Sequence, residues 1–209
     1  MNNIPTIVCV LKSGGPYTPV YVDRLYNSLL RNTSKSFKFI CLTDLPQNRF
    51  EVVKTIKLKH DWQGWWSKIE MFKYSGTIIT MDIDILIIKN IDSILDLPFM
   101  LNKNEIFMMK TFNPRRTFTT SVMAWNGNFK YIYNEFDFTS VKPKNWDQFY
   151  VLKKLQKIKI YPVQSHVSGI YSYKWHWKDS EPEDARMLLF HGVPRLHDCI
   201  GPIFKKHWR

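Results

Sequence analysis

The first part of the chain alternates between short apolar runs and one segment with helical spacing. Residues 6–11 (TIVCVL) predict a buried strand, and KSGGPY follows it as a loop. From Pro19, apolar residues recur every three or four positions, which predicts a helix over 19–32 with the proline in its first turn. Residues 37–44 (FKFICLTD) predict a second strand, and the β-α-β order favours a parallel α/β sheet. The apolar positions of the helix are Val22, Leu25, Tyr26, Leu29 and Leu30.

The later pattern predicts more strands and two helices. The run 77–90 (TIITMDIDILIIKN) is apolar on both sides of two aspartates and predicts a buried strand. After Gly64, a short helix is expected to end before Gly76, with Trp66, Ile69, Met71 and Phe72 toward the core. The remaining predicted elements are strands over 106–112, 117–128 (closed by an Asn-Gly turn) and 185–192, and a helix over 145–156.

Length and composition indicate one globular domain. The chain has 209 residues, of which 44% are hydrophobic and 15% aromatic, and it contains neither a repeat nor a low-complexity tract. We therefore expect a single α/β domain over residues 1–209, with a central mixed, mostly parallel sheet flanked by helices. The final FKKHWR is compatible with the N-terminal part of a longer protein.

Cysteine usage and hydropathy bear on the compartment. Cys9, Cys41 and Cys199 are odd in number and far apart, which disfavours a disulfide framework or a zinc knuckle. The N-terminus lacks the basic start and long apolar stretch of a signal peptide. No run approaches the roughly 20 apolar residues that span a bilayer. These features predict a cytoplasmic protein with reduced cysteines and no membrane span.

The chain is strongly basic, with a net charge of +12 and a pI near 9.6. Such a charge favours anionic partners, among them nucleic acid, nucleotide phosphates and acidic membrane surfaces. The basic residues are scattered and no nucleic-acid-binding motif is present, so we expect no nucleic acid as partner. A metal-dependent protein that binds or processes nucleic acid remains the alternative, and a catalytically inactive sugar-binding module is a third hypothesis. The oligomeric state stays open.

Asp82 and Asp84 are the strongest candidates for chemistry. Buried carboxylates are costly unless they are paired or bound to a metal. On a regular strand, side chains two apart share a face, so both carboxylates could reach one cation. Carboxylate oxygens and one imidazole suit Mn²⁺, and Mg²⁺ is possible. The competing interpretation, two surface aspartates on an edge strand, is disfavoured by the apolar flanks.

Polar residues also follow the other predicted strands. In α/β sheets, ligands collect at the carboxyl ends of strands, where these residues would meet the aspartate pair. A metal there would bridge a nucleoside diphosphate and neutralise the charge of the departing group, with nearby cations adding to that effect. For each cation, a solvated surface position is the alternative. The strand-end residues are Lys12, Ser13, Thr43, Asp44 and His191, and the candidate cations are Lys68, Lys174 and Arg195.

The ordered motifs VLKSGGPY, WWSKIEMF, TMDID, NWDQ and FHGVPRLH span nearly the whole chain. In this order they resemble the GT-A glycosyltransferases, specifically the glycogenin-like group of family 8. They are most similar to the small glycosyltransferases of large DNA viruses, such as the chlorella viruses that glycosylate their capsids. The resemblance implies a Rossmann-like GT-A fold and a Mn²⁺-dependent transfer of a hexose or deoxyhexose. The donor would be a UDP-sugar, and the acceptor a glycan or glycoprotein, including viral capsid glycan.

The resemblance also assigns roles to individual residues. Asp82, Asp84 and His191 would hold the metal, and Asp147 would be the catalytic base if the reaction inverts. A helix-start carboxylate stabilised by the macrodipole is the alternative for Asp147. Arg195 would replace the usual phosphate-binding lysine, because the family's order of His, two spacers, Gly and then Lys-Pro is altered here to His191-Gly192-Val193-Pro194-Arg195. The residues expected at the donor are Leu11, Lys12, Ser13, Tyr17, Thr43, Asp44, Lys68, Asp82, Ile83, Gln148 and Arg195, with Thr120 and Ser121 facing sugar hydroxyls.

Other histidines and tryptophans compete for parts of this site. His197 is a rival to His191 as metal ligand, whereas His166 has no motif partner and is interpreted as structural. Trp62, Trp65 and Trp66 could form a platform for sugar rings, although such clusters are more often core packing. We expect one of these tryptophans at the site and two in structural positions.

Overall fold

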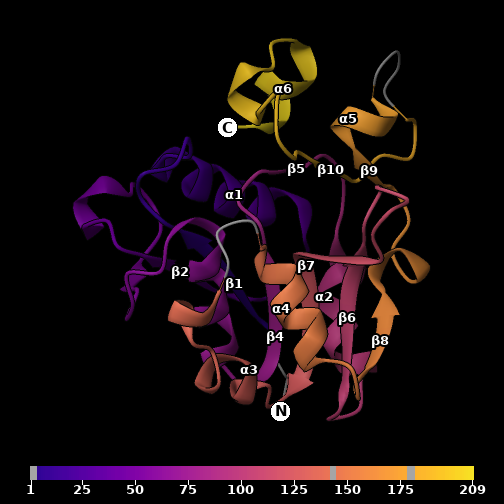
Figure 1. Cartoon of the computed structure of the whole chain (residues 1–209). Helices are drawn as coiled ribbons and strands as arrows, with labels where there is room; N and C mark the ends of the chain where they lie inside the picture. Colours follow the sequence, from indigo (N-terminus) through magenta and orange to yellow (C-terminus); the bar gives the residue numbers. More distant parts are fainter. Residues whose placement is uncertain (1–3, 142–144, 178–181) are drawn as a thin grey trace.

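The computed structural model describes residues 4–141, 145–177 and 182–209 (Figure 1). The described residues form a seven-stranded sheet in the order β3-β2-β1-β4-β7-β6-β8 and a three-stranded sheet in the order β5-β10-β9. The strands are β1 (Thr6–Leu11), β2 (Lys38–Thr43), β3 (Thr55–Lys57), β4 (Gly76–Met81), β5 (Ile85–Ile87), β6 (Glu105–Lys110), β7 (Phe118–Gly127), β8 (Lys159–Pro162), β9 (Ile170–Ser172) and β10 (Met187–Leu189).

The large sheet is mixed and mostly parallel, as predicted. β1 pairs in parallel with β2 and β4, β2 pairs in parallel with β3, and β6 pairs in parallel with β8. Only β7 runs against its neighbours β4 and β6 within the described part of the sheet. The predicted α/β fold class is therefore confirmed.

Helices cover both faces of the large sheet. Along β1, Ile7, Cys9 and Leu11 join the core under α1, whereas Val8 joins a second core under η2 and α4. This alternation follows from the two-residue period of a strand. The α-helices are α1 (Pro19–Asn32), α2 (Asp92–Asp96), α3 (Lys130–Asn134), α4 (Asp147–Lys154), α5 (Tyr173–His176) and α6 (Pro202–His207). The 3-10 helices are η1 (Gln47–Arg49), η2 (Gly64–Lys73), η3 (Leu97–Met100), η4 (Phe138–Ser140), η5 (Val163–Ser165) and η6 (Leu196–Asp198).

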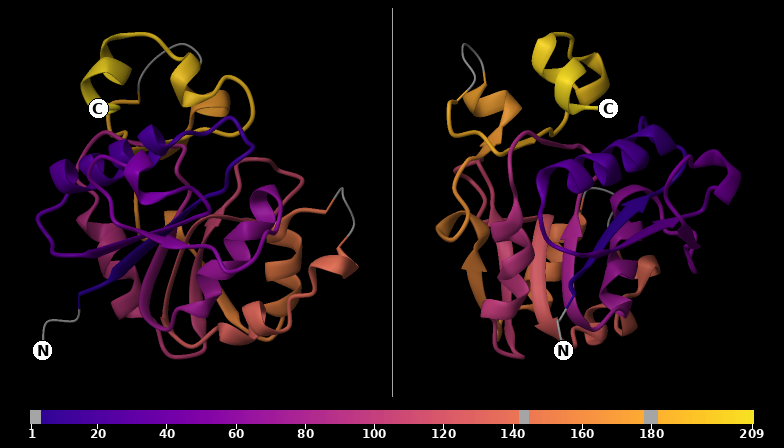
Figure 2. Two further views of the ribbon diagram at one scale, coloured as in Figure 1. Left: turned by 90° about the vertical axis from the view of Figure 1, so that its left-hand side faces the viewer. Right: turned by 180° about the vertical axis from the view of Figure 1, so that it is seen from behind.

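The C-terminal segment lies over α1. Figure 2 shows α6, in yellow, at the same end of the molecule as α1, in indigo. Arg31 of α1 donates hydrogen bonds to the main-chain carbonyls of His207 and Arg209, and Trp208 packs edge-on against Tyr21. The last residues of the chain therefore pack against both ends of α1.

The prediction for α1 is confirmed at both ends. Pro19 begins the helix, and Val22, Leu25 and Leu29 are buried against the sheet. Leu30 is an exception, because 53% of its surface is exposed. Its position on the helix, one residue past Leu29, turns it away from the apolar face.

The prediction of one strand over 77–90 is wrong. β4 ends at Met81, and β5 begins at Ile85 in the other sheet, where it pairs with β10. The chain thus changes sheets at the aspartates, which lie in a bend. Two main-chain hydrogen bonds hold the chain at this crossing. The Asp82 amide donates to the Ser121 carbonyl, and the Phe190 amide donates to the Asp84 carbonyl.

Several other predicted elements differ in kind or extent. The segment after Gly64 is a 3-10 helix, although Trp66, Ile69, Met71 and Phe72 are buried as expected. The late strand over 185–192 is shorter, covering Met187–Leu189. The strands β3, β8 and β9 were not predicted, because each has only three or four residues and no clear alternation of apolar residues.

The predicted Asn-Gly turn is not present. Asn126 and Gly127 belong to β7, where they pair with Thr77 and Gly76 of β4. Glycine is needed here for space, since a Cβ atom at Gly127 would lie 2.5 Å from the Lys103 carbonyl oxygen.

We expect Gly127→Ala to lower the free energy of unfolding by about 1–3 kcal/mol, because the backbone around Lys103 would have to move. Urea denaturation would measure the effect. Gly15→Ala is the matched control, since a Cβ atom there meets nothing within 4 Å. Equal stability of the two variants would contradict this account of the close approach.

Two of the three cysteines belong to the core of the large sheet. Cys9 and Cys41 are buried opposite each other on β1 and β2, and burial raises the pKa of the Cys9 thiol well above its usual value. All three cysteines carry free thiols. Among the helices that the structure describes, none has the length and apolar character needed to cross a bilayer.

Candidate functional site

The two aspartates lie where the two sheets meet. The Tyr17 hydroxyl donates to Oδ2 of Asp84 at 2.7 Å, and Nζ of Lys68 lies 2.6 Å from Oδ1 of Asp82. Burial raises the pKa of both carboxyls, and the neighbouring charge of Asp82 helps to raise the pKa of Asp84 to about 7. Asp84 has no cation of its own among the described ion pairs. The pair therefore carries more negative charge than its protein partners neutralise.

A polar network connects Asp82 to the start of α4. Lys68 donates to Oγ1 of Thr120 at 3.0 Å and lies 3.6 Å from Oδ2 of Asp147. Thr120 in turn donates to Asp147 at 2.5 Å. Burial lowers the pKa of Lys68, but the Asp147 and Asp82 carboxylates outweigh it and raise the pKa above its usual value. The ammonium group thus stays charged and holds two carboxylates from distant parts of the chain.

The loops after β1 and β2 are joined by a second set of charges. Nζ of Lys12 lies 2.6 Å from both Asp44 and Asp61, and Ser13 donates to Asp44 through its amide and its hydroxyl. Partial burial raises the pKa of Asp44, but the hydrogen bonds from Lys12 and Ser13 outweigh it and lower the pKa to about 2. Sequence reasoning placed Lys12, Ser13 and Asp44 at one site, and the structure brings them together. The sequence did not indicate Asp61 as a member of this site, because its position in HDWQ carries no distinctive signal.

The other residues predicted at the donor lie around these groups. Leu11 and Ile83 are buried, so only their main chains could face a ligand. Thr43 is also buried, and its hydroxyl accepts a hydrogen bond from the Leu45 amide at 3.1 Å. Gln148, beside Asp147 at the start of α4, lines a cavity next to the network.

Arg195 precedes η6 and lies near Tyr17. Burial raises the pKa of Tyr17, and the positive charge of Arg195 partly opposes this rise. Its Nε atom is buried and makes no hydrogen bond to any described group. A buried guanidinium donor without a partner is costly. An anionic ligand such as a phosphate oxygen would satisfy it, which agrees with the predicted role of Arg195.

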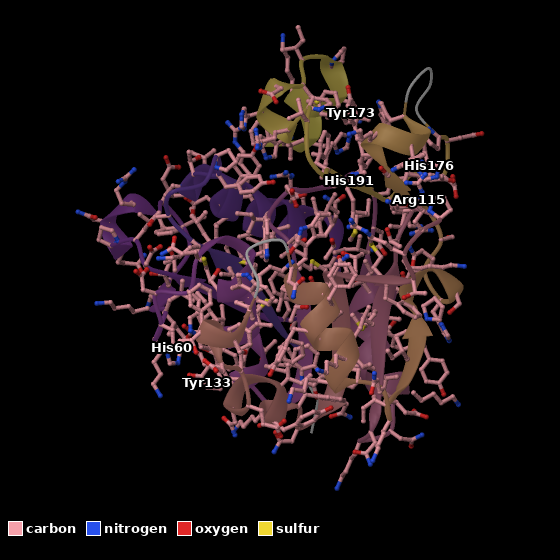
Figure 3. The ribbon with its side chains drawn as sticks, in the orientation of Figure 1. His60, Arg115, Tyr133, Tyr173, His176 and His191 are labelled. Atoms are coloured by element: carbon pink, nitrogen blue, oxygen red, sulfur yellow. The ribbon has the colours of Figure 1, made fainter. Side chains whose placement is uncertain are left out.

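His191 follows β10 and is labelled below Tyr173 in Figure 3. Its Nε2 atom lies 2.6 Å from the Ser172 hydroxyl. Partial burial lowers the pKa of His191, and the Lys174 charge adds to this. The neutral imidazole that results is the form that binds metals. Ser172 was not predicted, since nothing in the sequence links it to His191.

The rival histidines have other partners. Nδ1 of His197 lies 2.6 Å from the Tyr21 hydroxyl, and its Nε2 lies 3.3 Å from Asp198. The ring of His166 packs edge-on against Phe107 with centroids 4.8 Å apart, which agrees with a structural role.

The donor atoms suit a hard divalent cation, but they are not gathered into a complete metal site. Within residues 4–141, 145–177 and 182–209, no group of three or more His, Cys, Asp or Glu side chains is close enough to hold a metal. The two under-neutralised carboxylates fit Mn²⁺ or Mg²⁺. The third predicted ligand, His191, is hydrogen-bonded to Ser172 and would have to turn toward the aspartates.

The three tryptophans divide between core and surface. Trp62 and Trp66 are buried and pack against Phe136. Trp65 has 47% of its surface exposed, and its indole nitrogen donates to the Asn145 carbonyl at 3.2 Å. Two structural tryptophans were expected, and Trp65 is the one that remains available to a ligand.

Beside this network lies a cavity of about 400 Å³. Ser121, Gln148 and His191 line it, so it opens onto the same region as the aspartate network. The catalytic candidates therefore have ligand-sized space next to them.

Comparison with solved structures shows the fold of glycosyltransferases. The chain is similar to the glycosyltransferase GlyE of Streptococcus pneumoniae TIGR4, with 14% identity and a TM-score of 0.67 over 96% of this chain and 58% of GlyE. It is also similar to the bifunctional glycosyltransferase WbbM, with 12% identity and a TM-score of 0.60 over 94% of this chain and 47% of WbbM. An active-site mutant of LgtC matches with 11% identity and a TM-score of 0.59 over 96% of this chain and 93% of LgtC.

These likenesses confirm the predicted GT-A fold. The chain spans only about half the length of GlyE and WbbM. Comparisons of the sequence with protein-family models and with curated proteins find no match.

Proposed function

We propose that this chain is a metal-dependent glycosyltransferase that moves a sugar from a UDP-sugar to a hydroxyl group of a glycan or glycoprotein. The observation that carries the proposal is the under-neutralised pair of Asp82 and Asp84 at the junction of the sheets, in a fold shared with known glycosyltransferases. One of them, the galactosyltransferase LgtC, has been crystallised with donor and acceptor sugar analogues.

The donor would bind across the ends of β1, β2 and β4. The loop of Lys12, Ser13 and Asp44 would hold the uridine, and the unpartnered Nε of Arg195 would bind a phosphate oxygen. Asp82, Asp84 and His191 would hold Mn²⁺, with Mg²⁺ as the alternative. The bound metal would supply charge that stabilises the departing diphosphate.

Transfer breaks the bond between the anomeric carbon and the diphosphate oxygen and forms a bond from that carbon to the acceptor oxygen. If the configuration inverts, Asp147 takes the acceptor proton, and Lys68 and Thr120 hold its carboxylate in place. If the configuration is retained, the departing diphosphate takes the proton instead. Asp147 would lie beside the transferred sugar whether the configuration inverts or is retained.

The resemblance to family 8 makes the proposal more specific. The transferred sugar would be a hexose or deoxyhexose. The motifs are similar to those of the small glycosyltransferases of large DNA viruses. The proposed acceptors therefore include viral capsid glycan. No nucleic acid takes part in this scheme.

Calorimetry with UDP is the most direct test. We expect UDP to bind in the presence of Mn²⁺ and to bind at least about tenfold more weakly when the metal is removed with EDTA, because Asp82, Asp84 and His191 would hold the metal and its charge would attract the diphosphate. Titration with duplex DNA over a range of salt concentrations is the control. Metal-independent UDP binding, or affinity for DNA that falls steeply with salt, would contradict the proposal and favour a nucleic-acid-binding protein.

A further inference from the structure

The cavity beside the catalytic candidates has walls of a distinct character. It is lined by residues from the β6–β7 loop, the start of α4, the α5 segment and the residues after β10, but not by Lys12, Tyr17 or Asp82. It therefore meets the region proposed for the donor at Gln148 and His191, and extends away from the loops of Lys12, Tyr17 and Asp82. Among the described residues that line it, Arg116 and Lys174 are cationic, and none is an aspartate or glutamate.

Arg116 is held with its guanidinium group available to a ligand. Its Cζ atom lies 3.7 Å from the centroid of the Trp146 ring, which places the guanidinium over the indole in a cation–π contact. The loop that carries it is closed by hydrogen bonds from the Thr111 amide to the Thr117 carbonyl and from the Arg116 amide to the Asn113 carbonyl. No described carboxylate forms an ion pair with Arg116. Stacking occupies the face of a guanidinium and leaves its N–H edge for an anion.

Aromatic rings stand at the same cavity. Trp146 and Trp175 line it and have 36% and 49% of their surfaces exposed, respectively. Flat indole rings with an exposed face pack against the apolar C–H face of a sugar ring. Arg116, supported by Trp146, and the partly exposed ring of Trp175 together match a sugar that carries a negative charge.

We propose that this cavity binds the acceptor and selects one that bears an anionic group, either a carboxylate or a phosphate, through Arg116. This inference rests on the proposed function, since it names the acceptor class for that reaction. Lys174 also lines the cavity and adds a second cation to its wall. The high net charge of +12 favours an anionic acceptor as well.

The test compares three acceptors in a transfer assay: p-nitrophenyl β-glucuronide, the 6-phosphate of p-nitrophenyl β-glucoside, and the neutral p-nitrophenyl β-glucoside. We expect KM for at least one anionic acceptor to be about tenfold or more below that for the neutral glucoside, as a charge-assisted hydrogen bond predicts. Arg116→Gln should remove this preference by raising KM for the anionic acceptor. The two anionic acceptors distinguish a carboxylate from a phosphate.

Arg115→Gln is the matched control. Arg115 is adjacent to Arg116, is exposed, and does not line the cavity (Figure 3). Arg115→Gln also removes one positive charge, but it should keep the preference for the anionic acceptor. Equal KM values for all three acceptors, or equal effects of the two substitutions, would overturn the inference.

A separate binding measurement distinguishes failure of the inference from failure of the proposed function. If no acceptor is glycosylated and no UDP-sugar is hydrolysed, the proposed function is wrong. Calorimetric titration with the three glycosides then still tests the cavity. Binding of an anionic glycoside that Arg116→Gln weakens about tenfold, and Arg115→Gln does not, would support an anionic-sugar site. Absence of such binding would overturn it.

Discussion

Replacing Asp84 with asparagine is expected to lower metal-dependent turnover of a UDP-sugar by about 100- to 1,000-fold. Asparagine keeps the size of the side chain and can still accept the hydrogen bond that Tyr17 donates at 2.7 Å. It removes the negative charge that would hold the metal. Steady-state kinetics with Mn²⁺ would give the loss in turnover, and calorimetry with UDP and Mn²⁺ should show weaker metal-dependent binding.

The stability of the same variant separates a functional charge from a structural one. Burial and Asp82 raise the pKa of Asp84 to about 7, above its ordinary value near 4, so ionising Asp84 destabilises the metal-free fold. The free energy of unfolding of the wild-type protein should therefore fall as the pH rises from about 4 to about 7. That of Asp84→Asn should fall less over the same range. At pH 8 the variant should be at least as stable as the wild type.

Asp96→Asn is the control for this experiment. Asp96 forms an ion pair with Lys35 at the surface, where both side chains are 39% exposed, and it lies away from the aspartate pair. Its turnover should match that of the wild type. Unchanged turnover in Asp84→Asn would mean that the pair is structural. A large loss of stability in that variant would show that the charge is neutralised within the fold.

Local patterns predicted the elements that local forces determine. β1 and α1 match their predicted bounds, because an unbroken apolar run and a helical period that begins at Pro19 each specify one structure. The crossing at Asp82 and Asp84 could not be predicted in this way. The residues on both sides are equally apolar, and only their distant partners, Ser121 of β7 and Phe190 after β10, assign them to different sheets.

The candidate site shows the same division. The rule that ligands gather at strand ends led to Lys12, Asp44 and the aspartate pair, because the ends of neighbouring strands must meet. Asp61, Ser172 and Arg116 have no such rule, since each reaches the site from a loop or a short strand that tertiary packing positions. Reasoning from spacing also favoured a regular strand for the aspartates, whereas the bend directs one carboxylate to Lys68 and the other to Tyr17.

Replacing Lys68 with methionine is expected to lower the free energy of unfolding by about 3–5 kcal/mol and to abolish transfer. The Lys68 ammonium lies 2.6 Å from Asp82 and 3.6 Å from Asp147, and its side chain is only 17% exposed. Without it, the half-buried Asp82 and the buried Asp147 carboxylates remain with no described cation between them. Removing one partner of a buried ion network costs more than removing the network.

A second substitution tests that cause directly. In Lys68→Met/Asp147→Asn, one of the two carboxylates is neutral, and Thr120 can still donate to the amide oxygen at position 147. We expect this double variant to recover about half of the lost stability in urea denaturation, so that the two substitutions are not additive. Lys153→Met, at an exposed position of α4, is the control and should change stability by less than about 0.5 kcal/mol. Additive losses would show that Lys68 acts through packing alone. Recovered stability would show that the network holds α4 against the sheet. Transfer should stay abolished, because the double variant also lacks the Asp147 carboxylate proposed to act beside the sugar.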